Sequence, residues 1–141
     1  MVRFNVNPFF SDPHLIICDD AHVAENYFAS AWSLDIDRNK HPCLHAAVRS
    51  ILHAIIGEQN YARLYKDPDS ISDASWVDKV PTWELQKVLT QLTQAIDSNI
   101  KSDNDKELTY KWEVLRDHMP ACHMYLSCNK IFIRPLIVPT W

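Results

Sequence analysis

The segment TWELQKVLTQLTQAI, residues 82–96, has the clearest structural pattern in the chain. Its apolar residues recur at steps of three and four: Leu85, Val88, Leu89, Leu92 and Ile96. This spacing places them along one side of a helix, with the polar residues on the other side. Thr82 suits the N-cap position, because its hydroxyl can accept a hydrogen bond from a free amide of the first turn. The segment therefore predicts a helix that begins at Thr82 and buries one face.

Patterns on both sides of this segment predict further helices. We expect them over residues 14–35, from Pro42 to Gly57 with a turn or two more through residue 66, over 105–118, and from Pro120 to about residue 132. A proline just inside the start and a glycine just past the end are typical of helices. The turn-rich residues 67–75 indicate a loop. The predicted fold class is mainly α: a compact single-domain helical fold with extended N- and C-terminal arms.

The composition is typical of one globular domain. The chain has 141 residues, 47% of them hydrophobic, which is enough to bury a core without help from a metal or a disulfide. We therefore treat residues 1–141 as a single helical domain. The chain has one glycine, which argues against an all-β fold and against a glycine-rich phosphate-binding loop.

The charge and the apolar segments limit the classes of partner. The formal net charge is −4, whereas proteins that bind phosphates usually carry an excess of Lys and Arg. This charge weakens the case for DNA binding but leaves a local basic patch possible. No apolar run approaches the ~18 residues of a membrane span, and no signal-peptide pattern opens the chain. We expect no membrane partner, a cytoplasmic location and reduced thiols at the four cysteines, 18, 43, 122 and 128.

His22, Glu25 and Asn26 form the first candidate site. In a helix they share a face, because they lie three and four residues apart. A carboxylate beside an imidazole is a plausible acid–base pair, since each tunes the pKa of the other. The alternative is an ordinary polar helix face exposed to water.

Histidines and cysteines near the second predicted helix form another candidate. His41, Cys43 and His45 are close in sequence, and the Cys122-His123 pair could add ligands. Zinc favours these donors, but the spacing matches no established zinc pattern. Helix capping and core packing are the alternative, and we predict neither a metal nor another cofactor.

Basic residues from distant parts of the chain form the last candidate. They are Arg3, Arg49, Arg63, Lys66, Lys130 and Arg134. They would make one basic surface if the chain ends packed near the second predicted helix. Otherwise they are scattered surface charges.

Three short segments carry a family resemblance. They are Cys18-Asp19-Asp20-Ala21-His22-Val23, Asn39-Lys40-His41-Pro42-Cys43 and Val138-Pro139-Thr140-Trp141. Their order and spacing resemble those of small phage proteins related to pyrimidine-dimer DNA glycosylases, in which the first two segments open helices and the third ends the chain. The resemblance covers the ends and the first third of the chain. It implies a small helical domain, a viral origin, and DNA repair or processing in an infected host cell.

In this family the nucleophile is the N-terminal α-amine, which attacks C1′ of the damaged nucleotide. It forms a Schiff base, and a lyase step then cuts the strand. An α-amine suits this role, because its ordinary pKa of ~7.7–8.0 leaves a neutral fraction near pH 7. The resemblance assigns Val2 as the nucleophile after removal of Met1, with Arg3 and His22 as positioning groups. The family's catalytic glutamate lies seven residues after the histidine, where this chain has Ala29, so Glu25 is the carboxylate expected to replace it.

The same resemblance implies contacts with damaged double-stranded DNA at His41, Arg49, Lys130 and Trp141.

Whether the protein is an enzyme stays open at this point. One alternative is a viral accessory protein of the same fold that binds a protein partner, or DNA, without chemistry. A second is a metal-dependent enzyme built on His41, Cys43, His45 and His123. The oligomeric state is not determined by the sequence.

Overall fold

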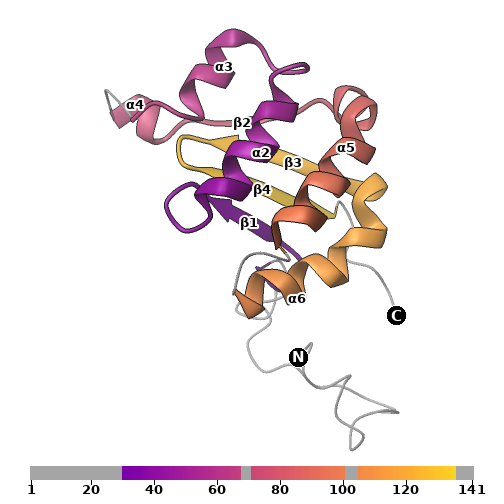
Figure 1. The fold of residues 1–141 in the computed structure, drawn as a ribbon. Coiled ribbons are helices and arrows are strands. Elements are labelled where there is room, and N and C mark those ends of the chain that lie inside the picture. The colour runs from indigo at the N-terminus through magenta and orange to yellow at the C-terminus, as the bar shows by residue number, and fades with distance from the viewer. Residues whose placement is uncertain (1–29, 68–70, 101–104, 136–141) are drawn as a thin grey trace, which may run out of the picture.

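The computed structural model describes residues 30–67, 71–100 and 105–135 (Figure 1). Its helices are α2 (Pro42–Leu52), α3 (Glu58–Arg63), α4 (Ile71–Ala74), α5 (Thr82–Ile100), α6 (Lys106–Leu115) and the 3-10 helix η2 (Arg116–Ala121). Its strands are β1 (Leu34–Asp37), β2 (Val77–Lys79), β3 (Cys122–Ser127) and β4 (Lys130–Pro135). The described part of the chain is therefore a mixed α/β fold, and the predicted mainly α class is wrong.

The strands of the described residues form one four-stranded sheet in the order β1-β4-β3-β2. Each neighbouring pair is antiparallel. The two inner strands, β3 and β4, follow each other in the chain and form a hairpin. The outer strand β1 pairs with β4 from the other end of the chain, with Leu34 opposite Ile133.

One predicted helix is wrong, and another is wrong at its end, because the apolar residues there alternate with a period of two. Residues 14–29 of the second helix lie outside the described residues. In the segment 122–133, where we expected a helix from Pro120, buried Met124 and Leu126 alternate with less buried neighbours in β3. Leu34 and Ile36 alternate in the same way in β1, so the helix predicted over residues 14–35 does not reach its predicted end. Short apolar runs fit both a helix and a strand. The tertiary packing selected the strand in both segments.

Other helix predictions are confirmed, with changes at their ends. α5 begins at Thr82, and its predicted stripe is buried except for Leu89, which is partly buried. The predicted helix over 105–118 is α6, with Asp105 as its N-cap, and η2 continues from it. α2 begins at Pro42 but ends at Leu52, and Gly57 is the extended N-cap of the next helix, α3. The predicted loop at 67–75 contains the short helix α4.

The core lies between one face of the sheet and the helices. α2 and α5 lie side by side across this face, and α6 adjoins β1 (Figure 1). The buried strand residues are Leu34, Ile36, Cys122, Met124, Leu126, Ile131 and Ile133. Fully burying one such aliphatic side chain stabilises the fold by roughly 1.5–3 kcal/mol. No helix in the described ranges is long and apolar enough to cross a membrane.

The side chains between these buried residues lie on the opposite side of the sheet, which we call the open face. They are Asp35 and Asp37 of β1, His123, Tyr125 and Ser127 of β3, Lys130, Phe132 and Arg134 of β4, and Val77 and Lys79 of β2. They are half-buried or exposed. The helices named above cover the other face, so this side carries the accessible chemistry of the sheet.

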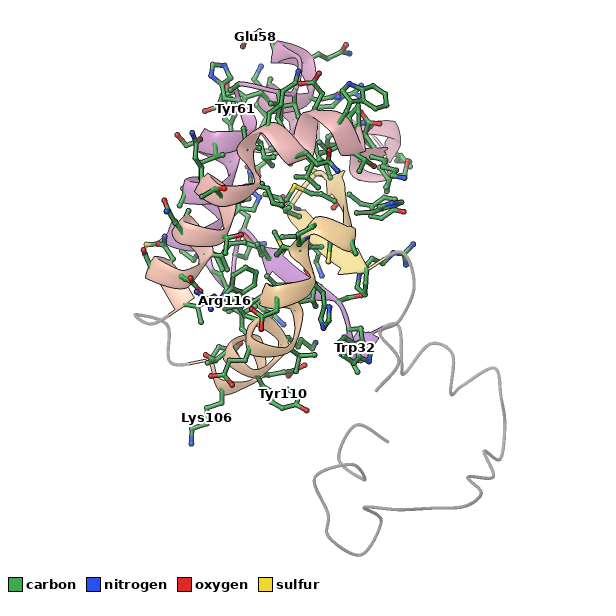
Figure 2. The ribbon with its side chains drawn as sticks, turned by 90° about the vertical axis from the view of Figure 1, so that its right-hand side faces the viewer. Trp32, Glu58, Tyr61, Lys106, Tyr110 and Arg116 are labelled. Atoms are coloured by element: carbon green, nitrogen blue, oxygen red, sulfur yellow. The ribbon has the colours of Figure 1, made fainter. Side chains whose placement is uncertain are left out.

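An acidic residue of α5 fastens α6 and the 3-10 helix to the core. Asp97 accepts a hydrogen bond from Trp112 Nε1 at 2.7 Å and a bidentate pair from the Arg116 guanidinium at 2.9–3.1 Å. The hydrogen bonds and charge of Asp97 raise the pKa of Arg116. Lys106 and Tyr110 point outward from α6 (Figure 2). The packing thus holds α6 against α5 and leaves Lys106 and Tyr110 exposed.

Candidate nucleic-acid interface

Two aromatic side chains occupy the centre of the open face. Tyr125 of β3 and Phe132 of β4 are directly opposite each other in the ladder of the two inner strands. Side chains in such positions lie on the same face, with Cβ atoms about 4.5–5.5 Å apart. Both are half-buried, so part of each ring faces solvent. We call them the aromatic pair.

A group of basic side chains surrounds Tyr125. The guanidinium carbon of Arg134 lies 4.9 Å from the centre of the Tyr125 ring. Arg134 is opposite His123 in the ladder, and Lys79 of β2 is opposite Tyr125. The His123 ring centre is 6.4 Å from that of Tyr125. We call Lys79, His123 and Arg134 the cationic cluster.

The proximity of these three groups also affects the pKa of His123. It lies below its ordinary value, first because of partial burial and then because Lys79 and Arg134 disfavour a further positive charge. Within the described ranges, the ion pairs use other basic residues. The cationic cluster is therefore a region of positive potential that carboxylates of the described residues do not cancel.

The β1 side of the open face has the opposite character. Lys130 Nζ lies 3.4 Å from Asp35 Oδ2 and 3.5 Å from Asp37 Oδ2. The charge of Asp35 is the main cause that raises the pKa of Lys130. Partial burial opposes this effect, but the hydrogen bonds to both carboxylates and the charge of Asp37 raise the pKa as well. Burial pushes the pKa of Asp37 upward, but amide hydrogen bonds and the Lys130 charge outweigh it and lower the pKa. We call Asp35 and Asp37 the acidic edge.

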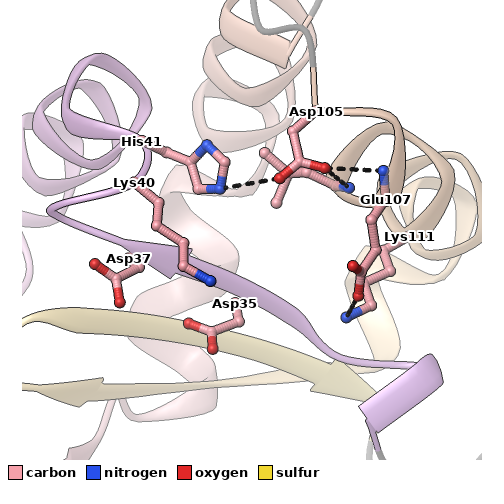
Figure 3. A pocket seen from close by; sticks show the side chains of 8 residues that line it. Asp35, Asp37, Lys40, His41, Asp105, Glu107 and Lys111 are labelled. Atoms are coloured by element: carbon pink, nitrogen blue, oxygen red, sulfur yellow. Dashed lines mark hydrogen bonds and ion pairs between the residues drawn. The ribbon is translucent and has the colours of Figure 1, made fainter.

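A polar hollow of about 150 Å³ continues from the acidic edge towards α6 (Figure 3). It is lined by Asp35, Asp37, Lys40, His41, Asp105, Glu107, Leu108 and Lys111. His41 Nε2 lies 3.6 Å from Asp105 Oδ2, and Lys111 Nζ lies 2.9 Å from Glu107 Oε1. Ligand pockets usually measure about 300–1,000 Å³ and are mostly apolar. The hollow is smaller and rich in carboxylates, so it does not suit a phosphate.

The structure does not bring the predicted DNA-binding residues onto one basic surface. His41 is buried and faces Asp105. Lys130 is paired with the acidic edge. Arg49 is on α2, and its guanidinium carbon lies 5.6 Å from the ring centre of Tyr61 and 5.3 Å from that of Tyr65. The remaining predicted site residues, Val2, Arg3, His22, Glu25 and Trp141, lie outside the described residues.

The residues of the metal hypothesis also lie apart. Cys43 is exposed at the start of α2, His45 is buried in the same helix, and His123 is on the open face. In the part of the chain that the structure describes, no three His, Cys, Asp or Glu side chains converge as a metal ion would need. Burial lowers the pKa of His45 to about 4 and raises that of Cys122 to about 12. These are properties of packed core groups.

The aromatic pair and Lys79 were not among the predicted site residues. In the helix expected from Pro120 to about residue 132, His123 and Tyr125 are two residues apart and would have pointed to different sides of the axis, and Arg134 would have followed the helix end. The alternation of His123 and Tyr125 with Met124 and Leu126 was the signal that could have located them.

No protein-family model, curated protein or solved structure matches the chain. The resemblance to the glycosylase-like phage proteins therefore stays a prediction from three short motifs. The function has to be argued from the geometry of the open face.

Proposed function

We propose that this protein binds nucleic acid through the open face of its sheet and performs no chemistry there. The observation that supports this most is the cationic cluster around Tyr125. Lys79, His123 and Arg134 come from three adjacent strands and offer a polyanion several contacts on one rigid surface. Aromatic side chains that adjoin basic groups on a sheet are a recurring means of nucleic-acid binding.

The formal net charge of −4 is compatible with this proposal, because the charges are unevenly distributed. The acidic edge and the carboxylates of the hollow lie towards β1 and α6, away from Lys79 on the opposite outer strand. Two or three phosphate contacts give a modest electrostatic contribution, with a slope of log K against log salt of about −2. We therefore expect affinity in the micromolar range at low salt. We place this binding in the cytoplasm, as the sequence predicts.

The test is binding of fluorescein-labelled oligonucleotides, measured by anisotropy over a salt series. Lys79→Glu and Arg134→Glu should each weaken binding about tenfold at low salt, because each replaces an attraction for phosphate by a repulsion. Lys106→Glu makes the same charge change on the outer side of α6 and should alter the affinity less than about twofold. If all three variants lose affinity equally, the open face is not the binding site.

A protein partner is the second candidate, and two exposed apolar residues favour it. Trp83 of α5 is 68% exposed and Val77 of β2 is 64% exposed. Exposed apolar side chains mark an interaction site when they form a contiguous patch. Absence of nucleic-acid binding at low salt would favour this candidate, and Trp83→Ala with Val77→Thr would then be the first variant to test against a purified partner.

Glycosylase or lyase chemistry stays a separate proposal from the sequence. Its residues Val2, Arg3, His22 and Glu25 lie outside the described part of the chain. Borohydride reduction in the presence of abasic-site duplex DNA would trap a Schiff base at Val2 as a covalent complex. Glu25→Gln should lower the rate of strand cleavage, and failure to trap any complex would contradict the proposal.

A further inference from the structure

We infer that the ligand of the open face is single-stranded nucleic acid, with unpaired bases stacked on Tyr125 and Phe132. This inference rests on the proposed function and specifies its ligand. The aromatic pair lies on the two inner strands of the sheet, and neighbouring bases can each use one ring. Such stacking needs base faces that are not already covered by their neighbours.

The width of the sheet argues against a duplex groove. Adjacent strands lie about 4.8 Å apart, so the axes of four strands span roughly 14 Å before side chains are added. The major groove of B-form DNA is only about 12 Å wide and admits a helix or a two-stranded ribbon. Tyr125 and Phe132 are in the middle of the sheet, where the outer strands would keep them from the base edges of a duplex.

The contact between Arg134 and Tyr125 supports the same ligand. The guanidinium carbon of Arg134 lies 4.9 Å from the centre of the Tyr125 ring. One nucleotide can therefore contact both the positive charge and the aromatic ring. A base can stack on this pair while its phosphate lies close to the positive charge. Lys79 adds a second positive charge on the same face of the sheet, from the strand on the other side of Tyr125.

The charges on the open face also predict the path of the strand. Lys79 is at the β2 side, whereas the acidic edge is at the β1 side, beyond Phe132. Asp35 is directly opposite Phe132 in the ladder, and its carboxylate repels phosphates. The sugar–phosphate backbone should therefore follow β2 and β3 and leave the bases over the aromatic pair. A site of about two or three nucleotides fits this surface.

The experiment compares three labelled 12-nucleotide probes with the full chain at low salt: oligothymidine, a duplex of the same length, and a base-free deoxyribose-phosphate strand. We expect oligothymidine to bind about tenfold more tightly than either of the others. Phe132→Leu and Tyr125→Leu keep an apolar side chain in the sheet but remove the ring, and each should weaken oligothymidine binding about tenfold. The salt dependence should stay unchanged, because these variants remove no phosphate contact.

Tyr110→Leu is the matched control, since Tyr110 is an exposed aromatic residue on α6 that is 46% accessible. It should leave all three affinities unchanged. Thermal unfolding followed by circular dichroism should show that every variant is folded at the assay temperature. Loss of affinity confined to oligothymidine and to the two open-face variants supports the inference.

The failures of the two proposals are distinguishable. Equal binding of the three probes, with no effect of Phe132→Leu or Tyr125→Leu, would overturn the single-strand inference and leave phosphate binding standing. No binding of any probe at low salt would overturn the proposed function and the inference together.

Discussion

Asp105 connects the beginnings of two helices through its contact with His41. Its Oδ2 lies 3.6 Å from His41 Nε2, and its Oδ1 accepts hydrogen bonds from the amides of Glu107 and Leu108 at 2.9 and 3.1 Å. His41 precedes α2 and is 7% exposed. One carboxylate therefore caps α6 and contacts the N-cap residue of α2. This gives His41 a structural role, whereas the sequence suggested a contact with DNA.

Replacement of Asp105 by alanine should destabilise the protein by about 1–2 kcal/mol, because α6 loses its N-cap. Urea unfolding followed by circular dichroism measures this loss as a lower transition midpoint with an unchanged slope. Glu113→Ala, on an exposed position of the same helix, is the control and should cost less than about 0.5 kcal/mol. A similar loss in both variants would mean that the cap and the His41 contact contribute nothing specific.

Nucleic-acid affinity should rise as the pH falls, because His123 gains a charge beside the bound phosphates. Its pKa is lowered in the free protein by burial and by Lys79 of β2 and Arg134 of β4. A polyanion counteracts these two charges and raises that pKa, so binding takes up a proton. The increase in nucleic-acid affinity should therefore be small above pH 7 and become larger as the pH falls from about 7 to about 5.5.

This pH dependence is measured with oligothymidine at constant ionic strength. His123→Gln should remove most of the gain in affinity at low pH. His53→Gln is the matched control, because His53 is an exposed histidine whose Nε2 lies 3.0 Å from Glu58 Oε1. An identical pH profile in wild type and His123→Gln would show that His123 does not contact the ligand.

Neutralising the acidic edge should strengthen binding. The double substitution Asp35→Asn and Asp37→Asn removes two carboxylates from the open face and frees Lys130, which they now hold at 3.4 and 3.5 Å. We expect affinity at low salt to increase about tenfold, with a steeper salt dependence because one more cation becomes available. Anisotropy titrations measure both quantities. Unchanged binding would place the ligand away from the β1 side of the sheet.

Stability should fall in mild acid because of His45. This side chain is 1% exposed, and its Nε2 has no hydrogen-bond partner among the described residues. Burial, and then Arg49 and Arg38, lower its pKa to about 4, against about 6.5 in the unfolded chain. Between these two pKa values the unfolded state binds more protons than the folded state. The contribution of neutral His45 to the free energy of unfolding is therefore fully present above about pH 6.5 and is lost as the pH falls towards 4.

The full loss corresponds to about 3 kcal/mol. Urea unfolding at about pH 7.5 and pH 5 should show a decrease in wild type that is clearly smaller in His45→Leu, which has no group to protonate. The exposed His53→Gln variant should retain the wild-type decrease. Equal acid sensitivity in wild type and His45→Leu would assign the effect to the carboxylates instead.

The described cysteines should differ in reactivity. Cys43 is exposed at the start of α2, whereas Cys122 is buried and its pKa is raised to about 12. The thiolate is the reactive form, so an alkylating reagent should modify Cys43 in the native protein and reach Cys122 only after unfolding. Peptide mass spectrometry after timed iodoacetamide treatment measures both rates. Equal rates would mean that β3 opens readily in solution.

Helix α5 shows how much of the fold the sequence could predict. Its long stripe of apolar residues and Thr82 at its start are local features, and a helix of 19 residues needs little else to be recognised. The strands β1 and β4 are different, because each is short and pairs with residues far away in the chain. Their apolar residues could be buried by a helix or by a strand. Only the partner strand resolves that ambiguity.

The sequence by itself determined the long amphipathic helices, the proline and aspartate that begin α2 and α6, and the presence of one core. These follow from backbone propensity and from the spacing of apolar residues within a few turns. The tertiary structure alone decided the sheet and its open face. Lys79, Tyr125 and Arg134 become neighbours only when β2, β3 and β4 pair. The hairpin of β3 and β4 is local, but the pairing of β2 with β3 depends on contacts between distant residues, which no local pattern specifies.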